Sequence, residues 1–247
     1  MDQGGPRLSF LSDVVHWFLV PAHWQGTEGV PNRLFEHMTM SVAATVTAAA
    51  IALPIGLALG HYGRGGAIAI NVSNVGRAIP SFAILVVALQ VVGIGAKPAF
   101  IALVALGAPP ILTNTYVGLR DVSEEMREAA RGLGMTGGQV LRKVEMPIAL
   151  PLIMAGIRTS AVQVVATATL AALVAWGGLG RFIVDGLSQR DLVQVFAGAV
   201  LVAVVSVSTE GTLALVQRAT TPVGVRIGKK QAGRLDDQAP RAELAAT

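Results

Sequence analysis

Five long apolar segments determine what this chain can fold into, because each is long enough to cross a membrane as a helix. A spanning helix needs roughly 20 apolar residues to cross about 30 Å of hydrocarbon, where its backbone must satisfy its own hydrogen bonds. The alternative is a large helical core in a soluble protein, which requires helices with a polar face. Because the segment from Ala43 to Gly60 has no polar residue besides Thr45 and Thr47, we favour the membrane.

The predicted fold is all-α, an integral membrane protein with about five transmembrane helices. The predicted spans are Met38–Gly60, Ala67–Val92, Pro98–Leu119, Ile148–Trp176 and Leu192–Val216. Prolines lie in or near them at Pro54, Pro80, Pro109, Pro110 and Pro151. Neighbouring helices can satisfy the backbone groups that a proline frees, so we expect kinks within continuous helices. Gly56 and Gly60 have the spacing of a close-packing face, although chance explains such a match in a chain with 28 glycines.

The composition supports one membrane domain, from residue 35 to residue 222, and no second domain. Hydrophobic residues make up 53% and charged residues 14%, against about 25% charged residues in soluble domains. The flanking parts are an N-terminal external or interfacial segment, residues 1–34, and a tail, residues 223–247. Mixed charge and few apolar side chains predict that this tail is disordered. No basic stripe with interleaved aromatic residues suggests nucleic-acid binding, and the absence of cysteine excludes disulfides and thiolate metal sites.

The segment from Leu8 to Val20 is apolar but is interrupted by Asp13 and His16. No small-residue cleavage site follows it, so it is a poor signal peptide. Trp17 and Trp24 suit a helix at the membrane interface. A poorly ordered leader is the alternative, and whether the segment spans or lies at the interface stays open.

Lysine and arginine residues predict the orientation of the spans. The hydrophilic segment Arg120–Met146 holds five of them and the tail after Gln217 holds six. The loop Gly93–Lys97 holds one and the loop Gly177–Asp191 holds two. Five spans then place the N-terminus outside. They place the hydrophilic segment, residues 120–147, and the C-terminus in the cytoplasm.

The segment between the third and fourth spans predicts a helix, a glycine turn and a second helix. Ser123 is a suitable N-cap, followed by two acidic residues where the helix dipole favours them. Gly132 and Gly134 permit the backbone angles that end a helix. Thr136 and Gln139 have capping-box spacing and start the second helix, and Pro147 predicts its end.

The same segment carries a motif that resembles the EAA loop of binding-protein-dependent ABC transporter permeases. The matching residues are Glu128, Ala129, Ala130, Gly134, Val144, Met146 and Pro147. The family prefers Ile and Leu where this chain has Val144 and Met146. In that family the loop docks in a cleft of a cytoplasmic ATPase, where Glu128 would offer its carboxylate to a cationic partner and Ala129 and Ala130 would permit close approach.

The resemblance implies a type I ABC importer permease fold in the bacterial plasma (inner) membrane. It implies four partners: a cytoplasmic ATP-binding cassette ATPase, a second permease subunit that is identical or paralogous, an extracellular or periplasmic substrate-binding protein, and the lipid bilayer. ATP would be used by the ATPase partner. We therefore expect no catalytic residue, no cofactor and no metal site in this chain.

Four further stretches resemble osmoprotectant uptake permeases, which handle glycine betaine, choline, carnitine or proline. They are Arg77–Ser81, Asn114–Gly118, Met154–Thr159 and Gly177–Gly180. Related permeases for methionine or other amino acids share several of these features and remain an alternative. Aromatic cages hold quaternary ammonium ligands best, and the spans contain no aromatic cluster. We therefore expect high-affinity recognition in the external binding protein.

Two competing hypotheses are an ion-coupled secondary transporter and an enzyme. Ion-coupled carriers usually place carboxylates or unwound carbonyls at mid-membrane. The first four spans contain no Asp or Glu, and Glu210 lies in the cytoplasmic half of the fifth. The four histidines show no metal-site or catalytic-triad arrangement. Energy supplied by a partner is therefore the favoured prediction.

Polar residues within the spans are the candidates for lining a translocation pathway. They are Arg77, Asn71, Asn74, Asn114, Gln163 and Arg158. The amides are equally suited to hydrogen bonds between helices. For the two arginines we favour snorkelling toward the cytoplasm over a place in the pathway.

Overall fold

The structure, a computed structural model, describes residues 6–220, and it describes side chains in that range except at residues 6–9, 68, 69, 72, 73 and 77. Every regular element in the described range is helical. The predicted disordered tail, residues 223–247, lies outside the described residues.

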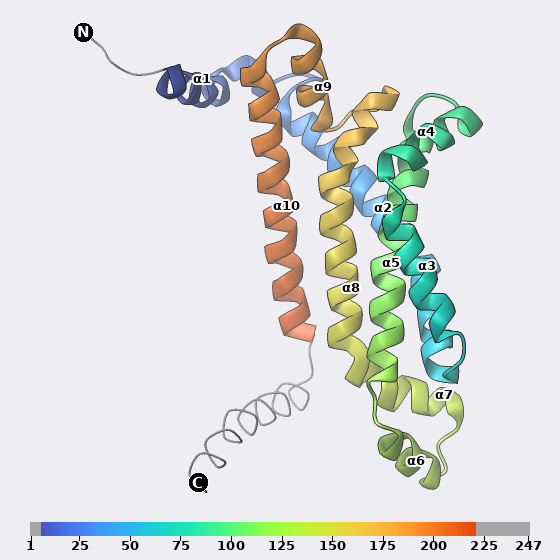
Figure 1. Cartoon of the computed structure of the whole chain (residues 1–247). Coiled ribbons are helices and arrows are strands. Elements are labelled where there is room, and N and C mark those ends of the chain that lie inside the picture. Colours follow the sequence, from blue (N-terminus) through green and yellow to red (C-terminus); the bar gives the residue numbers. More distant parts are fainter. Residues whose placement is uncertain (1–5, 221–247) are drawn as a thin grey trace, which may run out of the picture.

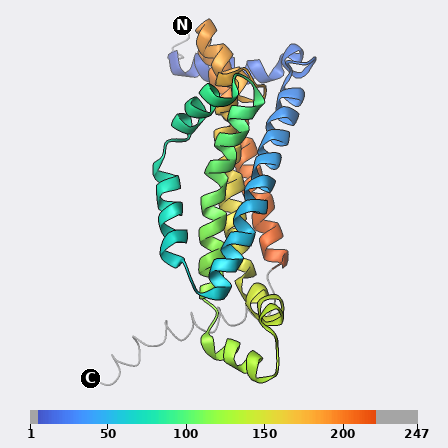
Figure 2. The same ribbon diagram turned by 90° about the vertical axis from the view of Figure 1, so that its right-hand side faces the viewer.

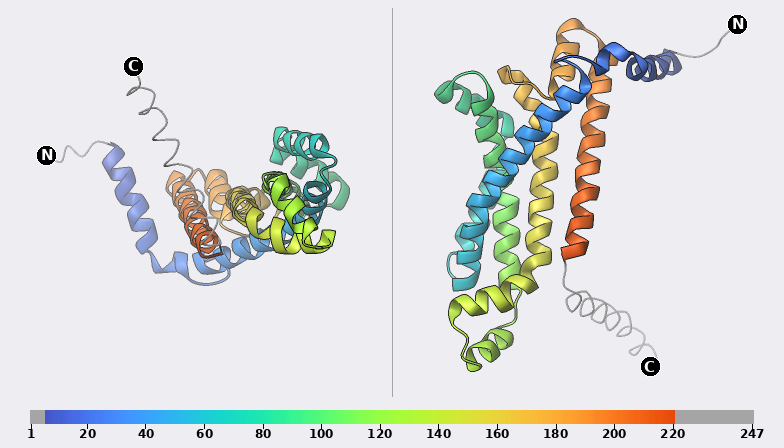
Figure 3. Two further views of the ribbon diagram at one scale, coloured as in Figure 1. Left: turned by 90° about the horizontal axis from the view of Figure 1, so that it is seen from below. Right: turned by 180° about the vertical axis from the view of Figure 1, so that it is seen from behind.

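Four long helices run side by side and form the body of the molecule (Figures 1 and 3). In the described range, the helical stretches long and apolar enough to cross a membrane are Val30–Tyr62 (α2), Ala96–Arg120 (α5), Gly137–Val174 (which includes α8, Met146–Thr167) and Leu192–Thr220 (α10). Helix α5 contacts α2 and α8, and α8 contacts α10. Four of the five predicted spans therefore coincide with helical stretches of spanning length.

The predicted second span, Ala67–Val92, is not one helix. It consists of α3 (Gly66–Ala78) and α4 (Ser81–Val92), which both pack on α5 (Figure 2). The break lies at Ile79, which is extended at φ −77° and ψ 120°. Pro80 explains it, since a proline disfavours helical angles in the residue before it and lacks an N–H of its own. The expectation of a kink in a continuous helix was wrong here.

The ends of two other spans also differ from the prediction. Helix α2 begins at Val30, before the predicted start at Met38. Its added first turns are polar and held by side chains: Glu36 is 3.1 Å from Arg33 and accepts a hydrogen bond from the Gly178 N–H at 2.8 Å. The fourth span changes from α8 to a 3-10 segment, η3 (Ala168–Val174). Apolar runs predict the spans but not the start of α2, which depends on these polar contacts.

Helix α1 (Pro6–Leu19) lies crosswise at the end of the bundle that carries α9 (Gly180–Gln189), and its 14 residues are too few to span a bilayer (Figure 1). Trp17 is buried and packs edge-on against Phe182 of α9. It also stacks on His23, in the short 3-10 segment η1 (Pro21–Trp24). The place of α1 at the membrane interface stays a prediction.

Glycines bring α2 into close contact with α5. A Cβ at Gly56 would lie 2.8 Å from the Cβ of Thr115, and one at Gly60 would lie 2.7 Å from the Cβ of Leu119. Contacts that short are not tolerated, so the two helices can approach this closely only because both positions lack a side chain. The interpretation of this glycine spacing as chance was wrong.

We predict that Gly56→Leu lowers the free energy of unfolding by about 1–3 kcal/mol, because a larger side chain must displace α5 from a packed contact. Gly211→Leu is the matched control, since a Cβ there meets nothing within 4 Å. The measurement is the thermal unfolding midpoint of both variants in detergent. Equal midpoints would show that α2 and α5 do not depend on this contact.

Candidate functional site

A two-helix segment between α5 and α8 projects from the end of the bundle opposite α9 (Figures 1 and 2). It contains α6 (Glu124–Gly132) and α7 (Gly137–Val140). The predicted caps are confirmed: Ser123 Oγ accepts the Met126 N–H at 3.4 Å, and Gln139 Oε1 accepts the Thr136 N–H at 2.8 Å. Gly134 has φ +81°, which confirms the predicted glycine turn.

The second helix does not end before Pro147 as predicted. Helix α7 continues through a π-helical segment, η2 (Leu141–Glu145), directly into α8. Met146 is helical at φ −60° and ψ −45°, and its N–H bonds to the Leu141 carbonyl, five residues back. A proline crowds the carbonyl four residues before it, and the wider π turn provides room just ahead of Pro147.

The π-helical segment carries a fully buried carboxylate, Glu145. Arg127 of α6, also buried, donates from Nε to Glu145 Oε1 at 2.8 Å and from Nη2 to the Leu119 carbonyl at 2.6 Å. Its Nη1 lies 3.2 Å from Glu124 Oε2. His61, at the end of α2, places Nδ1 2.6 Å from Glu145 Oε2. We call Glu145, Arg127 and His61 the buried charge cluster.

In the buried charge cluster, the charges of Glu145 and Arg127 compensate each other. Both Glu145 oxygens have partners, and Arg127 has three acceptors. Removing one member of such a pair leaves an uncompensated buried charge, which typically costs about 3–5 kcal/mol. Sequence reasoning missed the cluster, because Arg127 counted only toward orientation and His61 had no visible partner. The available signal was Glu145 itself, a carboxylate at the start of an apolar span.

The outward side of α6 carries an apolar stripe formed by Met126, Ala129 and Leu133. All three are exposed, Leu133 at 81%. The motif residue Glu128 is also exposed but lies on a different side of the helix from the stripe, whereas Ala130 is buried and turned inward. Apolar side chains exposed together on a short projecting helix indicate a protein-contact surface.

Val144, Met146 and Pro147, the last motif residues, are partly buried where η2 joins α8. They therefore lie near the bundle and not on the outward side of α6. The motif is split: Glu128 and Ala129 are exposed on α6, whereas Ala130 and the last motif residues are buried or partly buried.

The polar candidates for the pathway do not converge on one point. Asn114 Nδ2 donates to the Pro110 carbonyl of its own helix at 2.8 Å. Arg158 Nε lies 3.4 Å from Glu210 Oε1 of α10, so it is paired and does not rely on snorkelling alone. Asn71, Asn74 and Gln163 are exposed or partly exposed. Arg77 lies in α3, and its side chain is outside the described part of the structure.

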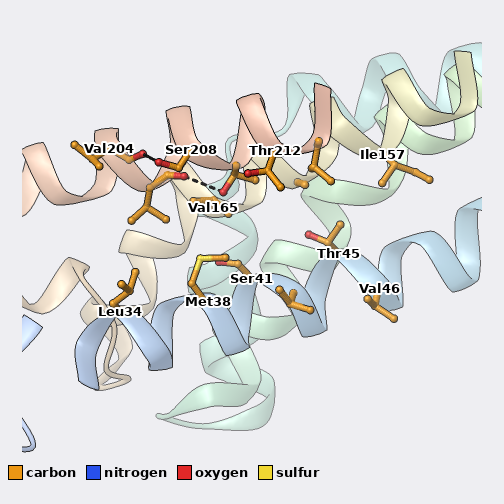
Figure 4. Close-up of a pocket in the computed structure, with 15 residues that line it drawn as sticks. Leu34, Met38, Ser41, Thr45, Val46, Ile157, Val165, Val204, Ser208 and Thr212 are labelled. Atoms are coloured by element: carbon orange, nitrogen blue, oxygen red, sulfur yellow. Dashed lines mark hydrogen bonds between the residues drawn. The ribbon is translucent and has the colours of Figure 1, made fainter. Parts of the chain in front are cut away.

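An apolar groove of about 610 Å³ lies between α2, α8 and α10 (Figure 4). Aliphatic side chains such as Ile157 and Val165 dominate its lining. The hydroxyls of Ser41 and Ser208 donate to carbonyls of their own helices at 2.8 and 2.7 Å. None of the residues that line it is charged or aromatic, so the groove provides no charged partner and no aromatic cage for an ammonium or a carboxylate group.

Comparison with known proteins gives the family. Residues 50–222 match the family model described as binding-protein-dependent transport system inner membrane component. The chain belongs to this family. It is a multi-pass inner membrane permease, and among residues 6–220 no group of three His, Cys, Asp or Glu side chains could hold a metal ion.

Curated relatives of the permease are similar over most of their length. The choline transport system permease protein OpuBB of Bacillus subtilis is 37% identical over 194 residues, 78% of this chain and 89% of that protein. The osmoprotectant import permease protein OsmW of Salmonella typhimurium is 31% identical over 219 residues, 87% of this chain and all of that protein. A solved structure of the MetNI methionine ABC transporter in an inward-facing conformation matches with a TM-score of 0.65 at 24% identity, covering 76% of this chain and 94% of that one.

These matches confirm the predicted type I ABC importer permease fold and the predicted role as the permease subunit of an ATP-binding cassette importer. The two-helix segment of the permease lies in the matched region. The role of its individual motif residues stays a prediction.

The glycine turn of the permease yields a direct test. We predict that Gly134→Val opens the α6–α7 turn, because a β-branched residue at positive φ costs about 1–2 kcal/mol. That cost raises the open population roughly 5- to 30-fold. Cleavage by trypsin after the exposed Arg131, followed by mass spectrometry, measures this population. Gly138→Val is the control, since Gly138 has open space and no positive φ. Equal cleavage rates would contradict the prediction.

Proposed function

We propose that this permease forms the translocation pathway for a small osmoprotectant such as glycine betaine, choline, carnitine or proline. The supporting observation is that relatives with choline, carnitine and glycine betaine in their names are 37–38% identical over at least 77% of this chain. The methionine transporter matches at lower identity and supports the fold alone. Methionine uptake, the alternative that the sequence features leave open, is the second candidate.

The outward side of α6 is the proposed docking surface for a cytoplasmic ATPase. The apolar stripe Met126–Ala129–Leu133 would be buried there, and Glu128 would meet a cationic group. This role requires α6 in the cytoplasm and α9 outside, which agrees with the lysine and arginine distribution along the chain. The ATPase hydrolyses ATP, and a second permease subunit completes the pathway.

The pathway is proposed to run past the polar residues of the spans. Arg158 and Glu210 have side chains that are 31% and 48% exposed in the single chain. Charges in hydrocarbon are costly and usually face protein or water, so this pair is expected to face the second subunit or the pathway. Asn71, Asn74, Asn114, Gln163 and Arg77 are the further candidates. An external binding protein supplies the high-affinity recognition.

The substrate proposal is tested with the assembled importer in vesicles, together with its binding protein. We expect ATP-driven uptake of a quaternary ammonium osmolyte, and stimulation of ATP hydrolysis by the loaded binding protein. Glycine betaine, choline, carnitine, proline and methionine are compared at equal concentration. Uptake of methionine alone would show that the substrate is methionine and not an osmoprotectant. Uptake driven by an ion gradient without ATP would contradict the assignment as an ATP-driven importer.

The docking proposal is tested by reversing the charge at Glu128. Mismatched charges across an interface can cost several kcal/mol, so Glu128→Lys should lower stimulated ATP hydrolysis and uptake together, while membrane insertion is unchanged. The matched control is Asp13→Lys, which reverses an exposed carboxylate on α1 near the opposite end of the bundle. Normal uptake by the Glu128→Lys variant would show that Glu128 does not contribute to docking of the ATPase.

A further inference from the structure

The α6 helix is joined to the rest of the chain by short turns that would by themselves let it pivot. Residues 121–123 precede it, and Leu133–Thr136, with Gly134 at positive φ, follow it. If α6 were attached only through these turns, it could move with a bound ATPase while the spans stayed in place. Something else must fix α6 to the bundle if its motion is to reach the pathway.

The buried charge cluster makes that attachment. Arg127 extends from α6 to the Leu119 carbonyl at the end of α5 and to Glu145 at the start of the fourth span. Glu145 in turn contacts His61 in the last turn of α2. One guanidinium and one carboxylate therefore join α6 to the cytoplasmic ends of three long helices, and both side chains are shielded from water.

We propose that the buried charge cluster is the linkage that transmits movement of α6 to α2, α5 and α8, with Arg127, Glu145 and His61 as positioning residues. The proposal rests on the proposed function of α6 as the docking helix. It assigns the transmission of movement to residues outside the EAA-like motif. The exposed residues of α6 contact the partner, and the cluster passes the displacement to the spans.

The geometry supports a stiff linkage. Arg127 has acceptors in three elements, α5, α6 and η2, so α6 cannot turn about its axis without breaking at least one bond. The guanidinium is planar and directional, which restricts rotation further than a single ammonium contact would. Because the charges are buried, a partly broken state is disfavoured and the joined helices are expected to move together.

The decisive variant removes both charges at once. Arg127→Gln/Glu145→Gln leaves no unpaired buried charge, so we expect the importer to assemble and to hydrolyse ATP. Uptake of glycine betaine per ATP hydrolysed should fall at least about tenfold, within the usual range of coupling between sites. A purely structural role predicts a normal ratio once assembly is restored, and that result would overturn the proposal.

The control is Arg181→Gln/Asp185→Asn, which removes an ion pair of 2.6 Å on α9 at the other end of the bundle. Its uptake per ATP should equal that of the unchanged importer. If the first double variant fails to assemble, His61→Phe decides, since it removes only the α2 contact and keeps the Arg127–Glu145 pair. A lowered ratio supports the linkage, and an unchanged ratio overturns it.

A second measurement does not depend on transport. Because the chain has no cysteine, spin labels can be placed at Tyr62→Cys and Gly132→Cys, both exposed, on α2 and α6. In the assembled complex with ATP and vanadate we expect one narrow distance distribution, which broadens when Arg127 and Glu145 are both Gln. Equal widths would overturn the linkage. If the unchanged importer shows no ATP-driven uptake, the proposed function is wrong. The distances between the spin labels would still test the linkage in that case.

Discussion

The close contact of α5 with its two neighbours is the packing on which the rest of the permease depends. In a bilayer, lipid tails are as apolar as helix surfaces, so helices associate through close packing and polar contacts. Gly56 and Gly60 let α2 approach α5, and Gly156 of α8 would place a Cβ 2.7 Å from that of Asn114. This packing fixes the end of α5 at which the Leu119 carbonyl accepts a hydrogen bond from Arg127. The attachment of α6 therefore depends on glycines in the spans.

The spans were predictable from hydropathy, but the path of the chain through its prolines was not. Pro54, Pro109, Pro110 and Pro151 lie inside continuous helices, whereas Pro80 separates α3 from α4. Two positions before Pro54 Ala52 is buried, two positions after it Gly56 lies against α5, and Pro109 and Pro110 are themselves buried. Such packing holds a helix together through a proline. The residues around Pro80 are largely exposed, and a sequence does not reveal which prolines will be supported in this way.

The two-helix segment and the buried charge cluster also differ in how far the sequence predicted them. Its caps and its glycine turn involve residues within a few positions of each other, and these were predicted. Glu145 and His61 are separated by 84 positions and meet only after the spans have packed. The apolar stripe on α6 was missed for another reason, since Met126 and Leu133 are ordinary residues until the structure shows that no described part of the chain covers them.

The π-helical segment explains how a carboxylate at the base of α8 comes to face inward. Val140, Glu145, Ala149 and Ile153 are all buried, at separations of five, four and four residues. In a regular α-helix each residue turns the chain by about 100°, so Val140 and Glu145 would lie on different sides. A π turn bonds residues five apart and brings both onto one face. That face continues into α8 through Ala149 and Ile153, which pack with Leu119. The π turn thus makes room for Pro147 within a continuous helix. It also turns Glu145 toward Arg127, so the same local irregularity positions the buried charge cluster.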